Sequence, residues 1–233
     1  MNNTPWLLEE VHPLDQAAEA GLEHVLGPGG RRGLGILAAP QLAVSLDGMV
    51  IHDNRKWFGE ADIRLDAFVV HGHGAEGEPE SFYTPQTFRF SRVRDQDELP
   101  IGESGLLLFY GKPLYFLDVF LTVSRDRKDA DDLSAILSGR LQDDQVQDAI
   151  GRLIGLVVAP EVAAVTAALG AAARLGEFVY QILRRVTGAT VGLFHTSWLE
   201  HRDRFGVGRH PESGAYRVKD LSFSYQIVSE DDT

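Results

Sequence analysis

The chain has 233 residues, and its 44% hydrophobic and 24% charged residues are typical of a globular protein that can bury a sizeable core. The net charge is −12, and no run of basic residues is longer than the pairs Arg31-Arg32 and Arg184-Arg185, which argues against a nucleic-acid partner. The absence of cysteine excludes disulfides, thiolate metal sites and cysteine nucleophiles. Residues 1–5 lack the basic stretch and apolar core of a signal peptide, so we expect a cytoplasmic protein.

The first forty residues predict a short helix and a linker ahead of the main domain. Residues 14–26 have a helical pattern: Pro13 precedes them, acidic residues occupy their first turns and Gly27 follows them. Residues 27–35 are rich in glycine, but a phosphate-binding glycine loop follows a strand and opens a helix, and here the order is reversed. We therefore interpret residues 1–40 as a helix and linker, and residues 41–233 as a single domain.

Three stretches between residues 41 and 124 alternate apolar and polar side chains with a period of two, which predicts strands with one buried face. The apolar positions are Leu42, Val44, Leu46 and Val50, then Ile63, Leu65, Ala67 and Val69, and then the odd-numbered residues from Tyr115 to Val123. Strand character returns at residues 190–199 and 216–228. Within the last stretch the apolar phase changes near Lys219-Asp220, and we predict a β-bulge there.

Between residues 131 and 187 the period changes to that of a helix. Apolar side chains at three- to four-residue spacing share one face, and Gly188 follows the last of them. They are Val146, Ala149, Ile150, Leu153, Ile154 and Val157, and then Leu175, Phe178, Val179, Ile182, Leu183 and Val186. Because the helices come as one block, the predicted fold is mainly β with a helical insertion (α+β). We expect an antiparallel β-sandwich of about seven to eight strands, with the helices of residues 131–187 packed on it.

No catalytic motif is evident. Residues 102–105, Gly-Glu-Ser-Gly, lack the residue that a nucleophile elbow places between its serine and its second glycine. Catalytic groups assemble in space, so an enzyme with an unrecognised site stays an alternative, although a non-catalytic protein is favoured. His71 and His73 would face the same way on a strand and could form a metal pair, with His195, His201 or His210 as a third ligand. The glycines around them favour a solvated loop instead.

Residues 153–173 are long enough to span a membrane and contain one charged residue, Glu161. They are built largely from alanine and glycine, and Pro160 interrupts them, which favours a buried helix of the insertion. A membrane-active, pore-forming type of protein that uses the apolar helices of residues 153–186 is the second functional alternative.

Residues 202–211 form a glycine-punctuated segment between two predicted strands. Its cationic and aromatic side chains are Arg202, Arg204, Phe205, Arg209 and His210. One interpretation is a long hairpin loop whose Arg and Asp side chains pair locally. The other is an interaction loop for a partner protein, since binding residues are often carried on loops.

Two acidic segments, residues 53–62 and 126–132, each follow a predicted strand. Calcium takes six to eight oxygen ligands, and two acidic loops at one end of a sandwich can supply them. This arrangement resembles a C2 domain, the calcium- and lipid-binding β-sandwich whose cations lie between two aspartate-bearing loops. The resemblance covers about residues 41–132 and the last two strands. It implies the metal ligands Asp53, Asp62, Asp126, Asp129 and Asp131.

Three features depart from the C2 pattern. Asp53 and Asp62 are further apart than the usual pair, the helical insertion is foreign to the family, and Arg125, Arg127 and Lys128 bring positive charge to the second loop. These cations could instead neutralise the aspartates in salt bridges. Taken with the other features, the sequence predicts a non-catalytic, C2-like interaction module with a weak Ca²⁺ dependence. Its expected contact is a partner protein, with a membrane lipid head group as the alternative.

Overall fold

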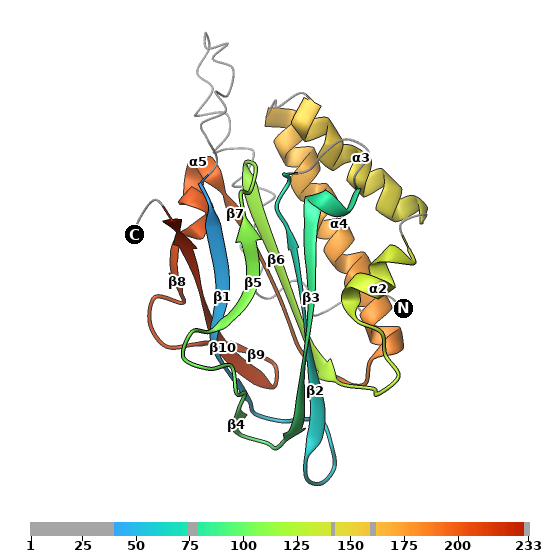
Figure 1. Ribbon diagram of the computed structural model, residues 1–233, viewed down its shortest axis with the longest axis vertical. Helices are drawn as coiled ribbons and strands as arrows, with labels where there is room; N and C mark the ends of the chain where they lie inside the picture. Colours follow the sequence, from blue (N-terminus) through green and yellow to red (C-terminus); the bar gives the residue numbers. More distant parts are fainter. Residues whose placement is uncertain (1–39, 74–78, 141–142, 159–161, 231–233) are drawn as a thin grey trace.

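Ten strands in two antiparallel sheets form a β-sandwich, and helices cover the outer face of one sheet (Figure 1). These elements come from a computed structural model, which describes residues 40–73, 79–140, 143–158 and 162–230. The predicted fold class is confirmed for this part of the chain. The strands exceed the expected number because three short ones, β4, β8 and β9, extend the edges of one sheet. The helix predicted at residues 14–26 and the glycine-rich linker lie outside the described residues.

Sheet A is built around the pair β1 and β10. Its strands are β1 (Leu42–Ile51), β4 (Asp97–Glu98), β5 (Leu106–Gly111), β8 (Gly208–His210), β9 (Tyr216–Val218) and β10 (Leu221–Ser229). β4 and β5 pair with β1, whereas β8 and β9 pair with β10. The first and last strands of the described chain are therefore neighbours at the centre of the sheet.

Sheet B has the strand order β3 (Tyr83–Val93), β2 (Ala61–Val70), β6 (Phe116–Arg125) and β7 (Thr190–Leu199). The central strands β2 and β6 are covered on both faces. Their odd-numbered residues, including Ile63, Leu65, Leu117 and Val119, are buried in the core between the sheets, as the alternation predicts. Their even-numbered residues point to the helical layer, where Phe68, Phe116 and Phe120 form part of a second core.

The helical layer consists of α2 (Leu133–Ser138), α3 (Asp144–Val158) and α4 (Val162–Val186), which lie over sheet B in Figure 1. Two 3-10 turns, η1 (Pro79–Phe82) and η2 (Arg204–Gly206), and the short helix α5 (Glu200–Asp203) complete the fold. The apolar stripes of α3 and α4 contribute Ile150, Leu153, Leu175 and Val179 to the second core. The predicted helical insertion is thus packed on one face of the sandwich. Within the described ranges, no helix is both long and apolar enough to cross a membrane.

Two details of the strand register differ from the sequence prediction. The bulge expected near Lys219-Asp220 is a two-residue hairpin turn, because β9 pairs with β10 directly on either side of it and Lys219 has a φ of 51°. A register shift lies in β1 instead, between Leu46 and Gly48. It changes the phase of the strand, so that Met49 is buried and Val50 is not, contrary to the predicted alternation.

A fully buried ion pair ties the helical layer to sheet B. Arg64 and Asp66 lie on the helix-facing side of β2, and two hydrogen bonds of 2.6 and 2.8 Å join the guanidinium to the carboxylate. Arg64 also donates to the carbonyl of Asp131, at the start of α2. Thr87 accepts from the Leu133 amide and donates to Asp66. Each of the three guanidinium nitrogens of this buried arginine therefore has a hydrogen-bond partner: two donate to Asp66 on the same strand, and one donates to the segment that leads into α2.

Candidate functional site

Four connecting segments meet at one end of the sandwich, which we call the loop end: residues 52–60, 94–96, 126–132 and 219–220. Backbone hydrogen bonds connect them. The His52 amide donates to the Asp220 carbonyl at 2.7 Å, and the Asp126 amide donates to the Asp62 carbonyl at 2.8 Å. The Asn54 amide donates to the Asp95 side chain at 2.8 Å. The two acidic segments singled out in the sequence do therefore lie at the same end.

The expected metal ligands are engaged differently from one another. Asp53 lies 4.0 Å from Arg55, and Asp126 forms an ion pair of 3.1 Å with Arg89. Asp62 accepts a hydrogen bond from a backbone amide, and Asp131 binds Arg64 through its carbonyl oxygen rather than its carboxylate. Salt bridges thus hold two of the five aspartates, and their cations are Arg55 and Arg89 rather than the Arg125, Arg127 and Lys128 that the alternative interpretation named. Among the described residues no three metal-binding side chains form a cluster, and the calcium set stays a prediction.

The most exposed large apolar side chains at the loop end are two adjacent aromatic residues. Trp57 is 89% exposed and Phe58 is 79% exposed. Their ring centroids are 6.0 Å apart in an edge-to-face arrangement. Large aromatic side chains with an apolar body carry much of the energy of protein interfaces, and a contiguous exposed pair marks a contact site more strongly than a single exposed residue does.

A buried asparagine holds this segment, Asp53–Glu60, which we call the aromatic loop. Asn54 has no exposed surface, and its side-chain amide donates to the carbonyls of Gly59 at 2.8 Å and Val93 at 3.0 Å. Its side-chain oxygen accepts from the amide of Lys56 at 2.9 Å. These bonds close the loop across its base and fix it to β3. The two aromatic rings are therefore displayed on a backbone that is already ordered.

The charges around the aromatic loop largely cancel. Glu60 forms ion pairs with Arg92 at 2.8 Å and Arg94 at 2.6 Å, and these hydrogen bonds lower the pKa of the Glu60 carboxyl. Arg55 forms an ion pair with Asp220 in the β9–β10 turn. Such exposed pairs add little stability each, but they leave the base of the loop without a strong field of either sign.

Residues 202–211 divide into buried and exposed groups. Phe205 is 2% exposed and belongs to the core, and His210 packs between Trp198 and Tyr225 with ring centroids 4.5 and 4.9 Å away. Arg202 forms a local ion pair of 2.8 Å with Asp203. Phe205 and His210 thus have structural surroundings, and the interaction-loop prediction rests on the exposed Arg202, Arg204 and Arg209.

Two of the histidines considered for a metal site, His71 and His195, lie on opposite faces of sheet B. His71 is buried against Phe109, its Nδ1 has no hydrogen-bond partner in the described structure, and burial lowers its pKa to about 4. His195 is on the opposite face of sheet B, where its Nε2 lies 2.7 Å from Asp118. Burial alone would lower the pKa of His195, but the charge of Asp118 and the hydrogen bond to it outweigh this effect and raise it.

Asp118, His195 and Ser197 bring together the residue types of a hydrolase triad in a different geometry. The Ser197 hydroxyl donates directly to the carboxylate of Asp118, and the imidazole binds the same carboxylate oxygen. His195 also stacks on Phe120 with ring centroids 3.9 Å apart. The Ser197 hydroxyl also lies 3.5 Å from Nε2 of His195, but the same nitrogen lies 2.7 Å from the Asp118 carboxylate, whereas in a triad the carboxylate binds the other ring nitrogen. The three side chains therefore do not have the geometry of a triad.

Comparison with known proteins identifies no relative, because no protein-family model matches the chain and no curated protein matches it.

The acids of residues 53–62 predicted a metal-binding loop, whereas Trp57 and Phe58 of the same segment were not predicted to be functional residues. The available signal was two adjacent large aromatic residues inside a charged segment that breaks the alternation of the flanking strands. An aromatic pair outside the periodic pattern has no face of a sheet to occupy. It must either fold back on the core or stay in solvent, and sequence alone does not separate these outcomes.

Proposed function

We propose that this protein is a non-catalytic interaction module that binds a partner protein through the aromatic loop, with Trp57 and Phe58 as the anchors. The observation that carries the proposal is the exposure of both rings on a loop whose base is fixed by the buried Asn54. The position agrees with the C2-like arrangement, in which loops at one end of a sandwich make the contact.

The expected gain is comparable to the cost of association. Burying two aromatic side chains removes roughly 300–500 Å² of apolar surface from water, which favours association by on the order of 8–12 kcal/mol. Association itself costs roughly 4–15 kcal/mol in lost freedom, and ordering a flexible loop would add to that cost. Because the aromatic loop is already ordered by Asn54, that additional cost is avoided.

A protein surface fits this site better than an anionic membrane does. Binding to anionic lipid needs free cationic groups in addition to apolar anchors. At the loop end the guanidinium groups of Arg55, Arg89, Arg92 and Arg94 are held in ion pairs, and the exposed Arg127 and Lys128 lie in a segment that also carries four aspartates. The chain as a whole carries a net charge of −12, which an anionic surface repels. A partner with an apolar pocket avoids both costs. We place this function in the cytoplasm, in keeping with the absence of cysteine.

Site-specific photo-crosslinking tests this assignment. A benzoylphenylalanine at position 58, in cells that make the natural protein, should give a discrete crosslinked protein species. The same group at Leu107, which is 50% exposed on β5, is the matched control and should not. In a second arm, the Trp57→Ser/Phe58→Ser variant should keep the melting temperature within the range of surface substitutions and lose the partner.

Three results would count against the proposal. Equal crosslinking from positions 58 and 107 would show that the aromatic loop is not selective. A blue shift of Trp57 fluorescence with phosphatidylcholine vesicles, without a protein crosslink, would assign the loop to lipid. If the Trp57→Ser/Phe58→Ser variant still bound the same partner through another surface, Trp57 and Phe58 would not be the anchors.

A further inference from the structure

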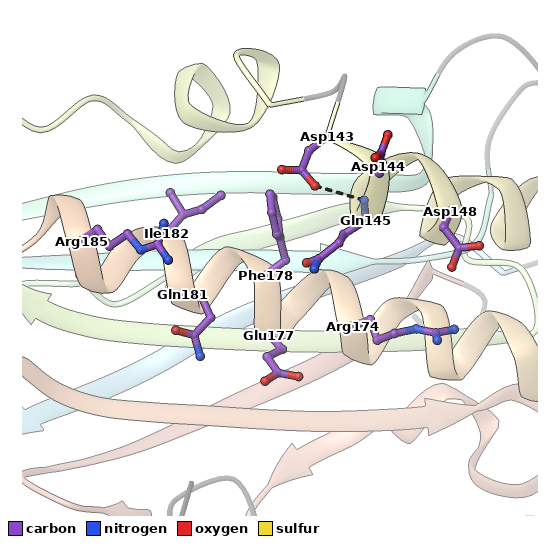
Figure 2. A pocket seen from close by; sticks show the side chains of 10 residues that line it. All are labelled: Asp143, Asp144, Gln145, Asp148, Arg174, Glu177, Phe178, Gln181, Ile182 and Arg185. Atoms are coloured by element: carbon purple, nitrogen blue, oxygen red, sulfur yellow. Dashed lines mark hydrogen bonds between the residues drawn. The ribbon is translucent and has the colours of Figure 1, made fainter. Parts of the chain in front are cut away.

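A cleft of about 820 Å³ lies in the helical layer between the start of α3 and the second half of α4 (Figure 2). It exists because the two neighbouring helices differ in length: α3 has 15 residues and α4 has 25. The two run side by side from their short connection, so α4 continues past the first residue of α3 (Figure 1). The second half of α4 is left without α3 alongside it.

The α4 side of the cleft has an apolar centre with a cation at each end. Arg174, Phe178, Ile182 and Arg185 line it at spacings of four, four and three residues, which places them on one face of the helix. Phe178 is half-buried and points into the cleft, whereas Ile182, one turn further along, is buried and only 8% exposed (Figure 2). Arg174 and Arg185 are exposed, and neither forms an ion pair with any residue that the structure describes.

The α3 side carries carboxylates. Asp143 accepts a hydrogen bond of 3.0 Å from the Gln145 amide and so caps the first turn of α3, and Asp144 is exposed beside it. Asp148, one turn further along, already has a partner in Arg152 at 3.1 Å. The free charges of the cleft are therefore acidic at the start of α3 and, apart from the exposed Glu177, basic along α4, with apolar surface between them.

The concave shape and this charge pattern restrict the occupant. The run from Arg174 to Arg185 extends over about 18 Å of helix, enough for a ligand of about three helical turns to lie alongside. A convex rod with one apolar face fits such a cleft, which is the helix-in-groove mode of recognition. A second copy of this cleft would not fill it, since two concave surfaces leave a void between them.

We propose that the cleft is a second interaction site, separate from the aromatic loop, that binds an amphipathic helical segment of a partner protein. The segment has apolar side chains at positions i and i+4 on Phe178 and Ile182. Carboxylates lie along its edge beside Arg174 and Arg185, and lysines lie along the edge beside Asp143 and Asp144. The unpaired charges on both sides of the cleft select one orientation of the bound helix in addition to increasing its affinity. A helix with its two charged edges exchanged would meet like charge on each side.

Fluorescence anisotropy with two labelled synthetic helices tests the proposal. Both are 14-residue peptides with leucines one turn apart; one has glutamates and lysines on the edges given above, and the other has them exchanged. The matched peptide should bind the full-length protein at least tenfold more tightly than the exchanged one. Arg174→Glu/Arg185→Glu should reduce binding of the matched peptide at least tenfold, and Phe178→Ala should weaken both peptides.

The control is Lys112→Glu/Arg217→Glu, which makes the same change in net charge at exposed basic residues outside the cleft. It should bind both peptides as the unmodified protein does, and circular dichroism should show that all variants are folded. Trp57→Ser/Phe58→Ser should also keep peptide binding, which separates this site from the aromatic loop. Equal affinity for the two peptides, no binding of either, or binding that survives Arg174→Glu/Arg185→Glu would overturn the proposal.

Discussion

Replacing Gly176 by alanine tests the packing of the helical layer on the sandwich. Gly176 is buried in α4, and a Cβ built there would overlap the Phe120 ring of β6. That ring has little room to move, because it stacks on His195 at 3.9 Å and lies 6.2 Å from the Phe68 ring. The absent side chain is therefore what lets α4 approach the sheet.

The expected cost combines two opposing effects. Alanine in place of glycine favours a helix by roughly 0.5–1 kcal/mol. Forcing an extra methyl group into a packed core costs typically 1–3 kcal/mol, occasionally more, and the fixed Phe120 ring favours the upper end. The net destabilisation of Gly176→Ala should be about 2 kcal/mol. For a protein of this size that corresponds to a fall of roughly 4–8 °C in melting temperature.

Gly170→Ala in the same helix is the matched control. Gly170 is exposed, and a Cβ there would meet no atom within 4 Å, so only the favourable effect on the helix remains. Differential scanning calorimetry should show Gly176→Ala below, and Gly170→Ala at or above, the unmodified protein. If both substitutions stabilised the protein equally, α4 would not pack on β6 as described, and a helical layer able to detach from the sheet would have to be considered.

Four further predictions concern buried polar groups and metal. Burial lowers the pKa of His71 to about 4 from an unfolded value near 6.5, so the unfolded state takes up the proton first as pH falls. The free energy of unfolding should therefore decrease by about 3 kcal/mol between pH 7 and pH 4. Urea titrations of His71→Leu should lack that part of the decrease. The raised pKa of His195 has the opposite sign: its stabilisation is present below pH 6.5 and is lost as pH rises through the folded value. His195→Gln should therefore remove this fall in stability above pH 6.5, and an unchanged profile would contradict the pairing with Asp118. Asn54→Ala leaves the carbonyls of Gly59 and Val93 without their donor. It should lower the free energy of unfolding in urea by about 2–3 kcal/mol and increase proteolysis within the aromatic loop. Asn54→Asp should restore only the hydrogen bond from the Lys56 amide. If Ca²⁺ binds the predicted aspartates, its dissociation constant should be roughly 10⁻⁴–10⁻³ M, and Ca²⁺ should raise the melting temperature. Asp126→Asn/Asp129→Asn should abolish that rise. The absence of binding heat in calorimetry at millimolar Ca²⁺ would rule out calcium binding.

The periodicity of the sequence was sufficient for the main elements. Strands at residues 190–199 and a helical block between residues 131 and 187 follow directly from local spacing, because a buried face repeats every two residues in a strand and every 3.6 in a helix. The same reasoning failed at Val50. A single-residue register shift in β1 depends on the partner strand β10 and leaves no mark in the apolar pattern before it.

The candidate sites depended on contacts that are distant in the sequence. The aromatic loop was already selected as an acidic segment, but the exposure of Trp57 and Phe58 follows from Asn54, whose hydrogen-bond partner Val93 is 39 residues away. The cleft between α3 and α4 depends on the unequal lengths of two helices and on the half-burial of Phe178, which the spacing alone assigned to a fully buried face.

By itself, the sequence determined the class of the fold and the position of its helical block, but it did not locate the strands β3 and β5. It has no cysteine and no basic run longer than a pair, and those statements hold in any conformation. The tertiary structure alone decided which polar side chains are buried and which apolar ones are exposed. Arg64 and Asp66 were interpreted as the solvent face of a strand and are the most buried ion pair described, because the helical insertion closes over them. Burial depends on what a distant segment covers, and that information is not contained in local spacing.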